Sequence, residues 1–532
     1  FQKKGVNSLD DMRGAYVFVY FDRIKNEIYI IPDAVGNRSL YYCITGHTLY
    51  FSSLLESLRA VLPQAGLNER WMTDFLAMDS LIMISENNET PIQGINRVSP
   101  GCYFKYDASG AKEMVYWKPV THNSAIKLKN DEEYGKAFTD IFRQAVEDTL
   151  RVDKTSIMLS SGYDSSAVAS LAAPLLKQQN KNLYAYTSVP DSRYYLKNNS
   201  EVLRDESDDV KKTAEYFGNI ICRFVDSEGK NPWNERKQML ETMEMPYKTV
   251  QNVIWLKDIM EAAYQNGSRM VLSGSFGNTT VSFSNVNLYL YELLKKGKWI
   301  RLWREVGIFC RKVGSGKKAG FKDLLKMLES EHKSMKPESV IGKSYASKYA
   351  LDTQNAIPRL CSLYQTMADG AYSGEKMHAA ICQFLALRQI GELHTKLSLS
   401  TGVLVRDPTK DRRIVEFCLN IPIEQFQKAG EERRLISVYM KNIVPPHIIS
   451  ERRIGVQSSD IKYRLQECWP DILEYCAELF RQDQPDSLID GVKIRNDIQR
   501  FMKTAYADIG QQDIVRLIYT ALAKEYMDRT KK

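Results

Sequence analysis

The stretch SIMLSSGYDSS, Ser156 to Ser166, decides the fold of the larger part of this chain. The apolar residues up to Leu159 predict a short buried strand, and Ser160 to Tyr163 predict a tight turn. Asp164 to Ser166 then predict the first turn of a helix that continues through Leu171. A helix therefore begins directly on a loop of serine and glycine that follows a strand.

Such a loop suits a phosphate. The free backbone N–H groups and the dipole at a helix start favour an anion, and Gly162 lets the backbone come close to it. Hydroxyl donors are added by Ser160, Ser161, Ser165 and Ser166. Because no lysine follows, as it would in a Gly-x-x-x-x-Gly-Lys loop, we expect Mg²⁺ to offset the phosphate charge, with Asp164 as its ligand. The alternative is a plain Ser-rich turn that opens a core helix.

The segment resembles the Ser-Gly-Gly-x-Asp-Ser-Ser loop of the ATP pyrophosphatases, which include asparagine synthetase, β-lactam synthetase and lasso-peptide cyclases. These enzymes cleave ATP between its α and β phosphates. The resemblance implies that ATP and Mg²⁺ are the cofactors. It also implies a set of nucleotide-binding residues: Leu159, Ser160, Ser161, Gly162, Asp164, Ser165, Ser166, Ser188, Ser273 and Gly274.

Length and composition set the frame for this interpretation. At 532 residues the chain should hold two or three domains, and 44% hydrophobic with 26% charged residues is ordinary for a soluble protein. The net charge of +8 is mild and indicates solubility rather than a nucleic-acid partner. Nine cysteines without a Cys-x-x-Cys pair favour reduced thiols in a cytoplasm over a zinc site, and no apolar run is long enough for a membrane span.

The first 120 residues predict an antiparallel, β-rich domain. The runs AYVFVYFD, EIYIIPD and SLYYCITGHTLYFSS predict a meander, a helix is expected around Trp71 to Ala77, and a hairpin follows through VSPGCYFKYDASGAKEMVYWKP. The run from Arg13 to Tyr42 resembles the later half of a class II glutamine amidotransferase (Ntn-type) domain, although Pro32 and Ser39 depart from its pattern. The family's N-terminal cysteine nucleophile would lie upstream of Phe1, so we treat the true N-terminus as missing. Cys43 is expected to be a core thiol.

Residues 121–532 predict an α/β ligase domain that becomes helical toward its C-terminus. Asn130 should cap a helix, and then strands (TSIML, LYAYTS, IICRF, RMVLS) alternate with helices. This alternation predicts a doubly wound parallel sheet, whose ligands bind beyond the carboxyl ends of the strands, where Ser160, Ser188 and Ser273 fall. Pro174 should kink or end the helix after the phosphate loop.

A second glycine-bearing loop, Leu272 to Thr280, resembles the family's Ser-Gly-x-Gly-Gly-Asp-Glu motif. Ser273, Gly274 and Gly277 match it, whereas Phe276, Asn278 and Thr279 replace a Gly, the Asp and the Glu. The amide oxygen of Asn278 can still bind Mg²⁺ but brings no charge. The resemblance implies that Asn278 and Asp164 are the metal ligands.

Two further residues are predicted to be catalytic by resemblance alone. Glu244 matches a Glu-x-Pro segment that lines the acceptor side, and Arg453 falls where the family has a catalytic lysine, with Arg452 beside it. Arginine can stabilise negative charge but cannot exchange a proton near neutral pH. For each, the alternative is a solvated or buried structural side chain. Gly314 to Lys318 is expected to be a surface loop and not a phosphate site.

The combined expectation is an ATP-dependent carbon–nitrogen ligase that forms AMP and pyrophosphate. The segment Arg-Asp-Pro-Thr, Arg406 to Thr409, and the departures at Asn278 and Arg453 favour the lasso-peptide branch, in which a precursor peptide is closed into a macrolactam. That resemblance implies a leader-binding protein and a leader protease as partners. The alternatives are a glutamine-hydrolysing asparagine synthetase and a non-catalytic nucleotide-binding scaffold.

Overall fold

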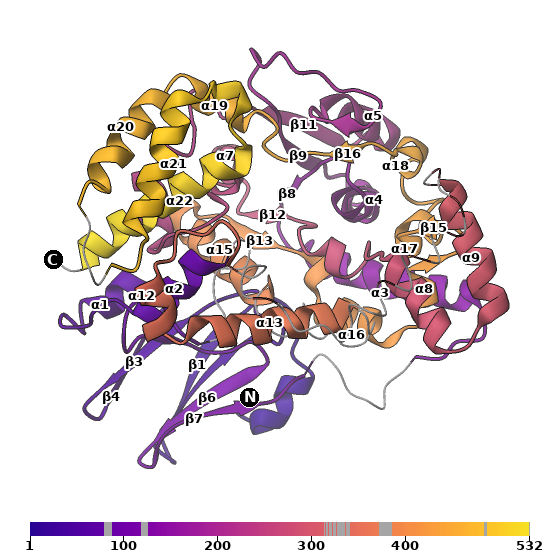
Figure 1. The fold of residues 1–532 in the computed structure, drawn as a ribbon. Helices are drawn as coiled ribbons and strands as arrows, with labels where there is room; N and C mark the ends of the chain where they lie inside the picture. Colours follow the sequence, from indigo (N-terminus) through magenta and orange to yellow (C-terminus); the bar gives the residue numbers. More distant parts are fainter. Residues whose placement is uncertain are drawn as a thin grey trace.

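The computed structural model describes residues 1–78, 88–118, 126–312, 341–371, 386–482 and 487–530, together with single positions between 313 and 340. Its ribbon divides into an all-antiparallel β-rich N-terminal part and a larger α/β part that ends in helices (Figure 1). The fold class predicted from the sequence is confirmed. The predicted boundary at residues 120 and 121 falls in 119–125, outside the described residues.

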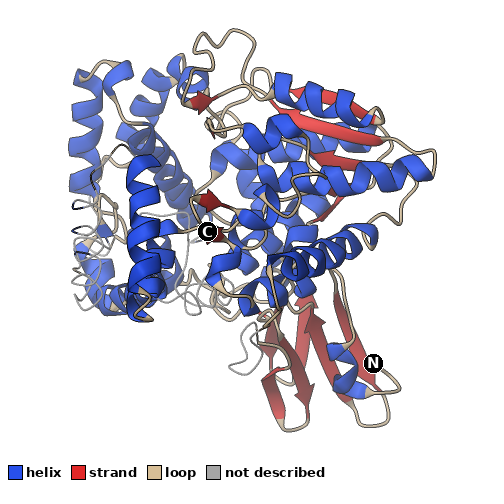
Figure 2. Cartoon of the chain, turned by 90° about the vertical axis from the view of Figure 1, so that its right-hand side faces the viewer, coloured by secondary structure: helices blue, strands red, loops and turns tan. Residues whose placement is uncertain are grey.

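The N-terminal part contains two antiparallel sheets that project together from the rest of the molecule (Figure 2). One has the order β1 (Val17–Asp22), β2 (Glu27–Pro32), β6 (Cys102–Asp107), β7 (Gly110–Val115), and the other β4 (Thr48–Ser52), β3 (Tyr41–Thr45), β5 (Asn96–Arg97). Ile30 and Phe104 of the first sheet share an apolar cluster with Tyr42 and Leu49 of the second, so the two sheets pack face to face.

The expected single meander is wrong, because the chain changes sheets after β2. The carboxylate of Asp33 accepts hydrogen bonds from the backbone N–H groups of Tyr16, Asn37 and Arg38, which fixes residues 33–38 as a turn. This turn carries the chain away from the first sheet and into β3. The expected hairpin is confirmed as β6 and β7.

The two parts of the molecule share a core. Helix α2 (Glu69–Ala77), which was predicted, contacts α12 (Lys348–Thr353), α13 (Ala356–Ala371) and α22 (Gln511–Thr530). Tyr41, Trp71 and Phe75 belong to the same apolar cluster as Val271 of the parallel sheet and Leu517 of α22. Cys43 lies in this cluster as well and is fully buried, which confirms the expectation of a core thiol.

The larger part is built on a five-stranded parallel sheet. Its order is β11 (Ile220–Val225), β9 (Leu183–Ser188), β8 (Thr155–Met158), β12 (Met270–Leu272), β13 (Leu404–Arg406). The chain leaves β8 toward β9 and β11 and later returns on the other side through β12 and β13. The order therefore reverses between β8 and β12, the place where open α/β sheets bind ligands. The edge strand β13 was not predicted.

Helices cover both faces of this sheet. Helices α3 (Asp131–Glu147), α4 (Tyr163–Gln178) and α5 (Ser207–Phe217) contact one another on one face, while α7 (Val250–Gln265) packs on the other face with α6 (Arg236–Met243) and α15 (Ala386–Thr401). The side chain of Asn130 accepts a hydrogen bond from Glu133 N and caps α3 as predicted. Helix α4 continues past Pro174 to Gln178, so the proline does not end it.

The remaining helices surround the sheet. They are α8 (Val286–Lys295), α9 (Trp299–Lys312), α16 (Arg412–Asn420), α17 (Arg434–Ser437), α18 (Pro446–Ser450), α19 (Ile461–Gln466), α20 (Trp469–Leu479) and α21 (Gly491–Lys503). None of the helices within the described ranges is long and apolar enough to cross a membrane. The predicted loop from Gly314 to Lys318 lies in the stretch 313–340, most of which is outside the described residues.

Candidate functional site: two glycine-bearing loops at the switch point of the sheet

The loop between β8 and α4 is shaped by its own serines. Ser165 Oγ accepts from Ser160 N at 3.1 Å and lies 2.8 Å from Ser160 Oγ, while Ser166 Oγ donates to Ser160 O at 3.1 Å. Ser166 is fully buried. The hydroxyls of Ser165 and Ser166 therefore hold the turn together, and their predicted role as donors to a phosphate stays a prediction. The unpaired N–H groups at the start of α4 remain the groups that would bind an anion.

The second loop lies directly against the first. A Cβ on Gly274 would lie 2.8 Å from Asp164 C and Ser165 N, and one on Gly277 would lie 2.2 Å from the Asp164 carboxyl. Only glycine fits at contacts this short. The two loops that the sequence singled out, more than 100 residues apart, thus form one site at the ends of β8 and β12.

The carboxylate of Asp164 lies at the centre of this site. Its Oδ1 is buried and has no hydrogen-bond partner among the described residues, although the Ser282 hydroxyl lies near the carboxylate. Burial, reinforced by the nearby Asp407, raises the pKa of Asp164 to about 6, although Ser282 and Arg433 act in the opposite direction. A buried carboxylate oxygen without a donor is costly unless a cation binds to it.

The residues here fit Mg²⁺. Asp164 offers an oxygen with no protein partner, and the exposed Asn278 offers Oδ1, which accepts from Ser282 Oγ at 3.4 Å. Ser282 therefore bonds to one predicted metal ligand and lies near the other. Nowhere in the described ranges do three or more His, Cys, Asp or Glu side chains gather in a way that could hold a metal. An ion at Asp164 would therefore take most of its ligands from phosphate oxygens and water, as is usual for Mg²⁺.

The other predicted nucleotide-binding residues line the same sheet edge. Leu159 is buried, donates its N–H to Tyr186 O and accepts from Thr187 Oγ1, so its side chain belongs to the core. Ser188 ends β9, and Ser273 follows β12 with its N–H bonded to Arg406 O at 2.8 Å. The carboxyl ends of β8, β9 and β12 thus meet as predicted, and the unpredicted strand β13 lies beside β12. The role of each residue toward a nucleotide stays a prediction.

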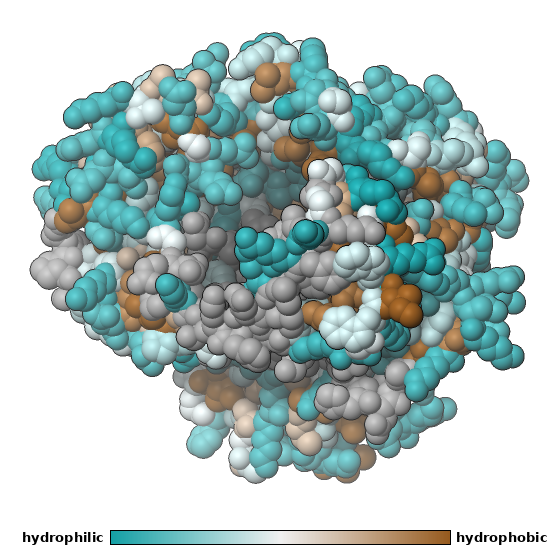
Figure 3. Space-filling view, turned by 45° about the vertical axis from the view of Figure 1, so that its right-hand side comes forward, coloured by the Kyte–Doolittle hydropathy of each residue, from teal (hydrophilic) through white to brown (hydrophobic). Residues whose placement is uncertain are grey.

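A polar network beside the phosphate loop contains Arg453. Ser161 Oγ donates to Glu206 at 2.9 Å, and the short strand β16 (Ile454–Gly455) pairs with β10 (Val202–Leu203) just before Glu206. Burial raises the pKa of Glu206, so this carboxylate is poorly solvated beside the loop. The space-filling view shows the molecular face hollowed near its centre, with mostly hydrophilic side chains around the hollow (Figure 3).

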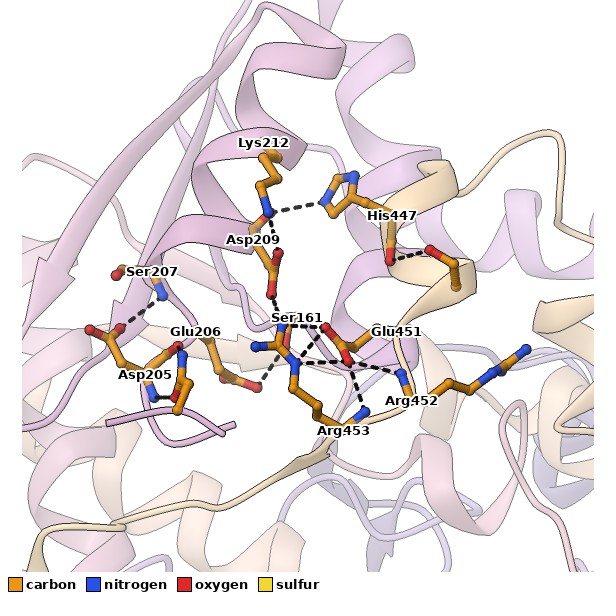
Figure 4. Close-up of polar contacts among 12 residues, drawn as sticks. Ser161, Asp205, Glu206, Ser207, Asp209, Lys212, His447, Glu451, Arg452 and Arg453 are labelled. Carbon is orange, nitrogen blue, oxygen red and sulfur yellow. Dashed lines mark hydrogen bonds and ion pairs between the residues drawn. The ribbon is translucent and has the colours of Figure 1, made fainter. Parts of the chain in front are cut away.

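Within that network Arg453 is held by two carboxylates. Its guanidinium donates to Glu451 at 3.0 Å and to Asp209 at 3.2 Å, and Arg453 in turn holds the pKa of Glu451 at about 2. The side chain of Arg452 extends away from the cluster (Figure 4). Arg453 thus anchors its loop to α5 in this structure, and a catalytic role for it stays a prediction.

Glu244 lies where the two parts of the molecule meet, and its predicted role on the acceptor side stays a prediction. Its buried carboxylate accepts from Leu55 N at 2.7 Å and Glu56 N at 3.2 Å, and Lys396 Nζ also contacts it. These partners belong to the start of α1 (Leu55–Arg59) and to α15. The described contacts of Glu244 join the two parts of the molecule and include none of the phosphate-loop residues.

Three residues near the site were missed at the level of sequence. Ser282 lies near both predicted metal ligands, Arg433 contributes positive charge near Asp164, and Asp407 accepts from Ser275 Oγ and Phe276 N at 3.0 Å. A signal existed only for Asp407, in the Asp-x-Thr spacing that also bonds its carboxylate to Thr409 N.

Comparison with known families places the chain. The asparagine synthase family model matches residues 137–509, and a glutamine amidotransferase domain model matches residues 1–117. The chain belongs to the asparagine synthase family.

Relatives of known name are distant. Asparagine synthetase [glutamine-hydrolyzing] 3 of Bacillus subtilis is 20% identical over 93% of this chain and 74% of its own length. Amidase chry2 of Gibberella zeae is 26% identical over 40% of this chain and amidase chyE of Penicillium rubens 24% over 55%. The matches span only 32% and 43% of these two amidases.

Proposed function

We propose that this chain is an ATP-dependent ligase that forms an amide bond through an activated carboxylate. In the proposed reaction a carboxylate oxygen attacks the α-phosphorus of ATP and pyrophosphate leaves. An amine then attacks the acyl carbon, AMP leaves, and the nitrogen loses one proton. The observation that carries this proposal is the buried, unpartnered Oδ1 of Asp164, set between two glycine-bearing loops at the switch point of the sheet.

Each group of the site has a part in the proposal. The N–H groups at the start of α4 would bind phosphate oxygens, and Mg²⁺ held by Asp164 and Asn278 would offset their charge. Gly274 and Gly277 let the second loop close over Asp164. Because the protein supplies position and charge, its largest contribution would come from ordering the reactants, which is worth roughly 7–11 kcal/mol in favourable cases.

The finer proposal is a macrolactam cyclase that joins the N-terminal amine of a precursor peptide to its own acidic side chain. It is supported by the departures at Phe276, Asn278 and Arg453. A leader-binding protein and a leader protease, all in the cytoplasm, complete this proposal. The alternative, asparagine synthesis, is supported by the Bacillus subtilis relative, which matches 93% of the chain.

The test is mass spectrometry of the products with pyrophosphate detection. The protein receives MgATP with either aspartate and ammonia or a peptide that carries an acidic side chain. A peptide lighter by one water, formed with AMP and pyrophosphate, supports the cyclase, and asparagine supports the alternative.

The matched pair of variants is Asp164→Asn and Asp153→Asn. Asp153 precedes β8 at the opposite edge of the sheet and is fully exposed, so the same chemical change there should leave the rate unaltered. Asp164→Asn should lower pyrophosphate release at least 100-fold. The scaffold interpretation would be supported instead by equal rates of pyrophosphate release for wild type and Asp164→Asn. It would also be supported if the protein bound MgATP but released no pyrophosphate with any carboxylic acid supplied.

A further inference from the structure

A cavity lies between the two parts of the molecule, outside the nucleotide site. Residues 12–16 and 33–35 with Asn37 form its wall on the N-terminal side, and Thr149 with residues 406–408 and 411–412 form the opposite wall. Its volume is about 40 Å³. A water needs roughly 10–15 Å³ of such space, so the cavity has room for about three waters or the three heavy atoms of a carboxylate group.

The carboxylates of the three acidic residues that line the cavity already have hydrogen-bond or ion-pair partners within the protein. Asp33 accepts from the backbone N–H groups of the turn that it fixes, and Asp407 accepts from the second glycine-bearing loop and from Thr409. Asp411 pairs with Arg413 at 2.9 Å. Burial raises the pKa of both Asp33 and Asp407. These carboxylates offer little further attraction to a cation.

The arginines of the cavity differ from one another. Arg412 pairs with Glu416 at 2.7 Å and also approaches Asp10, and the exposed Arg13 donates to backbone carbonyl groups. Within the described ranges, no acceptor lies within hydrogen-bond distance of the Arg406 guanidinium, and no carboxylate lies within 4.0 Å of it.

The Arg406 guanidinium lies near Gly14, a residue of the cavity wall that has no side chain. Its Nη1 would lie 3.8 Å from a Cβ on Gly14, which has φ +107° and lines the same cavity. Burial lowers the pKa of Arg406, yet a guanidinium stays charged in proteins. The half-buried guanidinium keeps N–H donors that a ligand can reach, and a planar carboxylate satisfies two of them at once.

We propose that this interdomain cavity binds the carboxylate group of a small organic acid, held by the Arg406 guanidinium. Arg13 and Arg412 at the cavity wall, and Arg38 close to Arg406, add positive charge around the anion. The flat fork of the guanidinium favours a carboxylate over a spherical or tetrahedral anion.

The site is connected to the nucleotide loops by two adjacent residues. Arg406 O accepts from Ser273 N, and the carboxylate of Asp407 accepts from Ser275 Oγ and Phe276 N. Gly277, which follows in the same loop, lies against Asp164. Occupancy of the cavity therefore alters the affinity of the nucleotide site, and the effect is reciprocal.

The test uses the full chain without turnover, so its failure is distinguishable from failure of the proposed ligase activity. Thermal unfolding is followed while sodium acetate replaces sodium chloride at constant ionic strength, with sodium bromide as a third arm because phosphate would also bind the nucleotide loop. Acetate at about 50 mM should raise the melting temperature of wild type in a saturable way, and chloride and bromide should not.

Variants locate the effect. Arg406→Gln and Arg406→Lys should lose the acetate response, whereas the matched control Arg481→Gln, at an exposed arginine that pairs with Glu478 outside the cavity, should keep it. Acetate should also change the dissociation constant of MgATP at least twofold in wild type only. A wild type that responds equally to acetate and chloride, a larger response to bromide, or an undiminished response in a folded Arg406→Gln overturns the proposal.

Discussion

Buried carboxylates occur at the switch point of the parallel sheet and at the junction of the two parts of the molecule. The two regions differ in whether the carboxylate oxygens have hydrogen-bond partners. At the switch point, Asp164 has one buried oxygen without a partner. At the junction of the two parts, Glu392 accepts from Arg97 at 2.9 Å and 3.2 Å and from Tyr41, and Glu244 accepts from two N–H groups and Lys396. Saturated carboxylates indicate structure, whereas an unsatisfied one indicates a ligand.

The strongest test of this contrast is to break a saturated pair. Lys396→Met removes a fully buried cation from Glu244 and should lower the free energy of unfolding by about 3–5 kcal/mol, because the carboxylate is left buried and uncompensated. Urea unfolding measures this. Lys343→Met, at an exposed lysine whose Nζ lies 3.7 Å from Asp513, should cost less than about 1 kcal/mol, because Asp513 keeps its pair with Arg516. Equal losses in the two variants would contradict the structural role of the junction.

The next test disturbs the unsatisfied side. Gly277→Ala would place a methyl group 2.2 Å from the Asp164 carboxyl, so the second loop must move away. Pyrophosphate release should fall about 100-fold, equivalent to about 2.7 kcal/mol, and the overpacking should also lower the free energy of unfolding by about 1–3 kcal/mol. Gly66→Ala is the control, since its methyl group would meet only the flexible side chain of Gln93 at 3.4 Å. If Gly277→Ala releases pyrophosphate at the wild-type rate, the second glycine-bearing loop does not take part in the reaction.

A smaller effect concerns stability and pH. The pKa of Asp164, raised to about 6, means that the folded state binds this proton more tightly than the unfolded state, so stability falls as pH rises from about 4 to 6. Without Mg²⁺, Asp164→Asn should therefore be more stable than wild type at pH 7.5, by on the order of 2 kcal/mol. The gain should disappear below pH 4.

Unfolding at both pH values measures this difference, and Asp153→Asn should show no gain. The apparent affinity of wild type for Mg²⁺ should increase about tenfold per pH unit below pH 6 and level off above pH 7, because the metal binds the ionised carboxylate. A flat profile would contradict an Asp164 metal site.

The smallest expected effect separates two neighbouring arginines. Arg453→Lys keeps the charge but loses the fork that binds Glu451 and Asp209, and should lower pyrophosphate release about tenfold through a displaced loop. Arg452→Lys should change it less than twofold. If Arg452→Lys has the larger effect, the catalytic prediction passes from Arg453 to its neighbour.

The local signals in the sequence were informative where a motif fixes backbone geometry. The loop from Ser160 to Gly162, the N-cap at Asn130 and the four alternating strands were all predicted and confirmed. The edge strand β13 was missed because its three residues, Leu404–Arg406, lie inside a motif and have no alternation long enough to detect. The meander failed because a buried Asp33 turns the chain between sheets.

The sequence by itself determined the class of fold, the phosphate loop and the choice of Asp164, because glycine, serine and hydrophobic spacing act on the nearest residues. Only the tertiary structure decided that Gly277 packs on Asp164, that Glu244 joins the two parts, and that Arg453 is paired. Whether a polar group is satisfied depends on partners far away in the chain, such as Lys396 for Glu244, and spacing along the sequence carries no record of them.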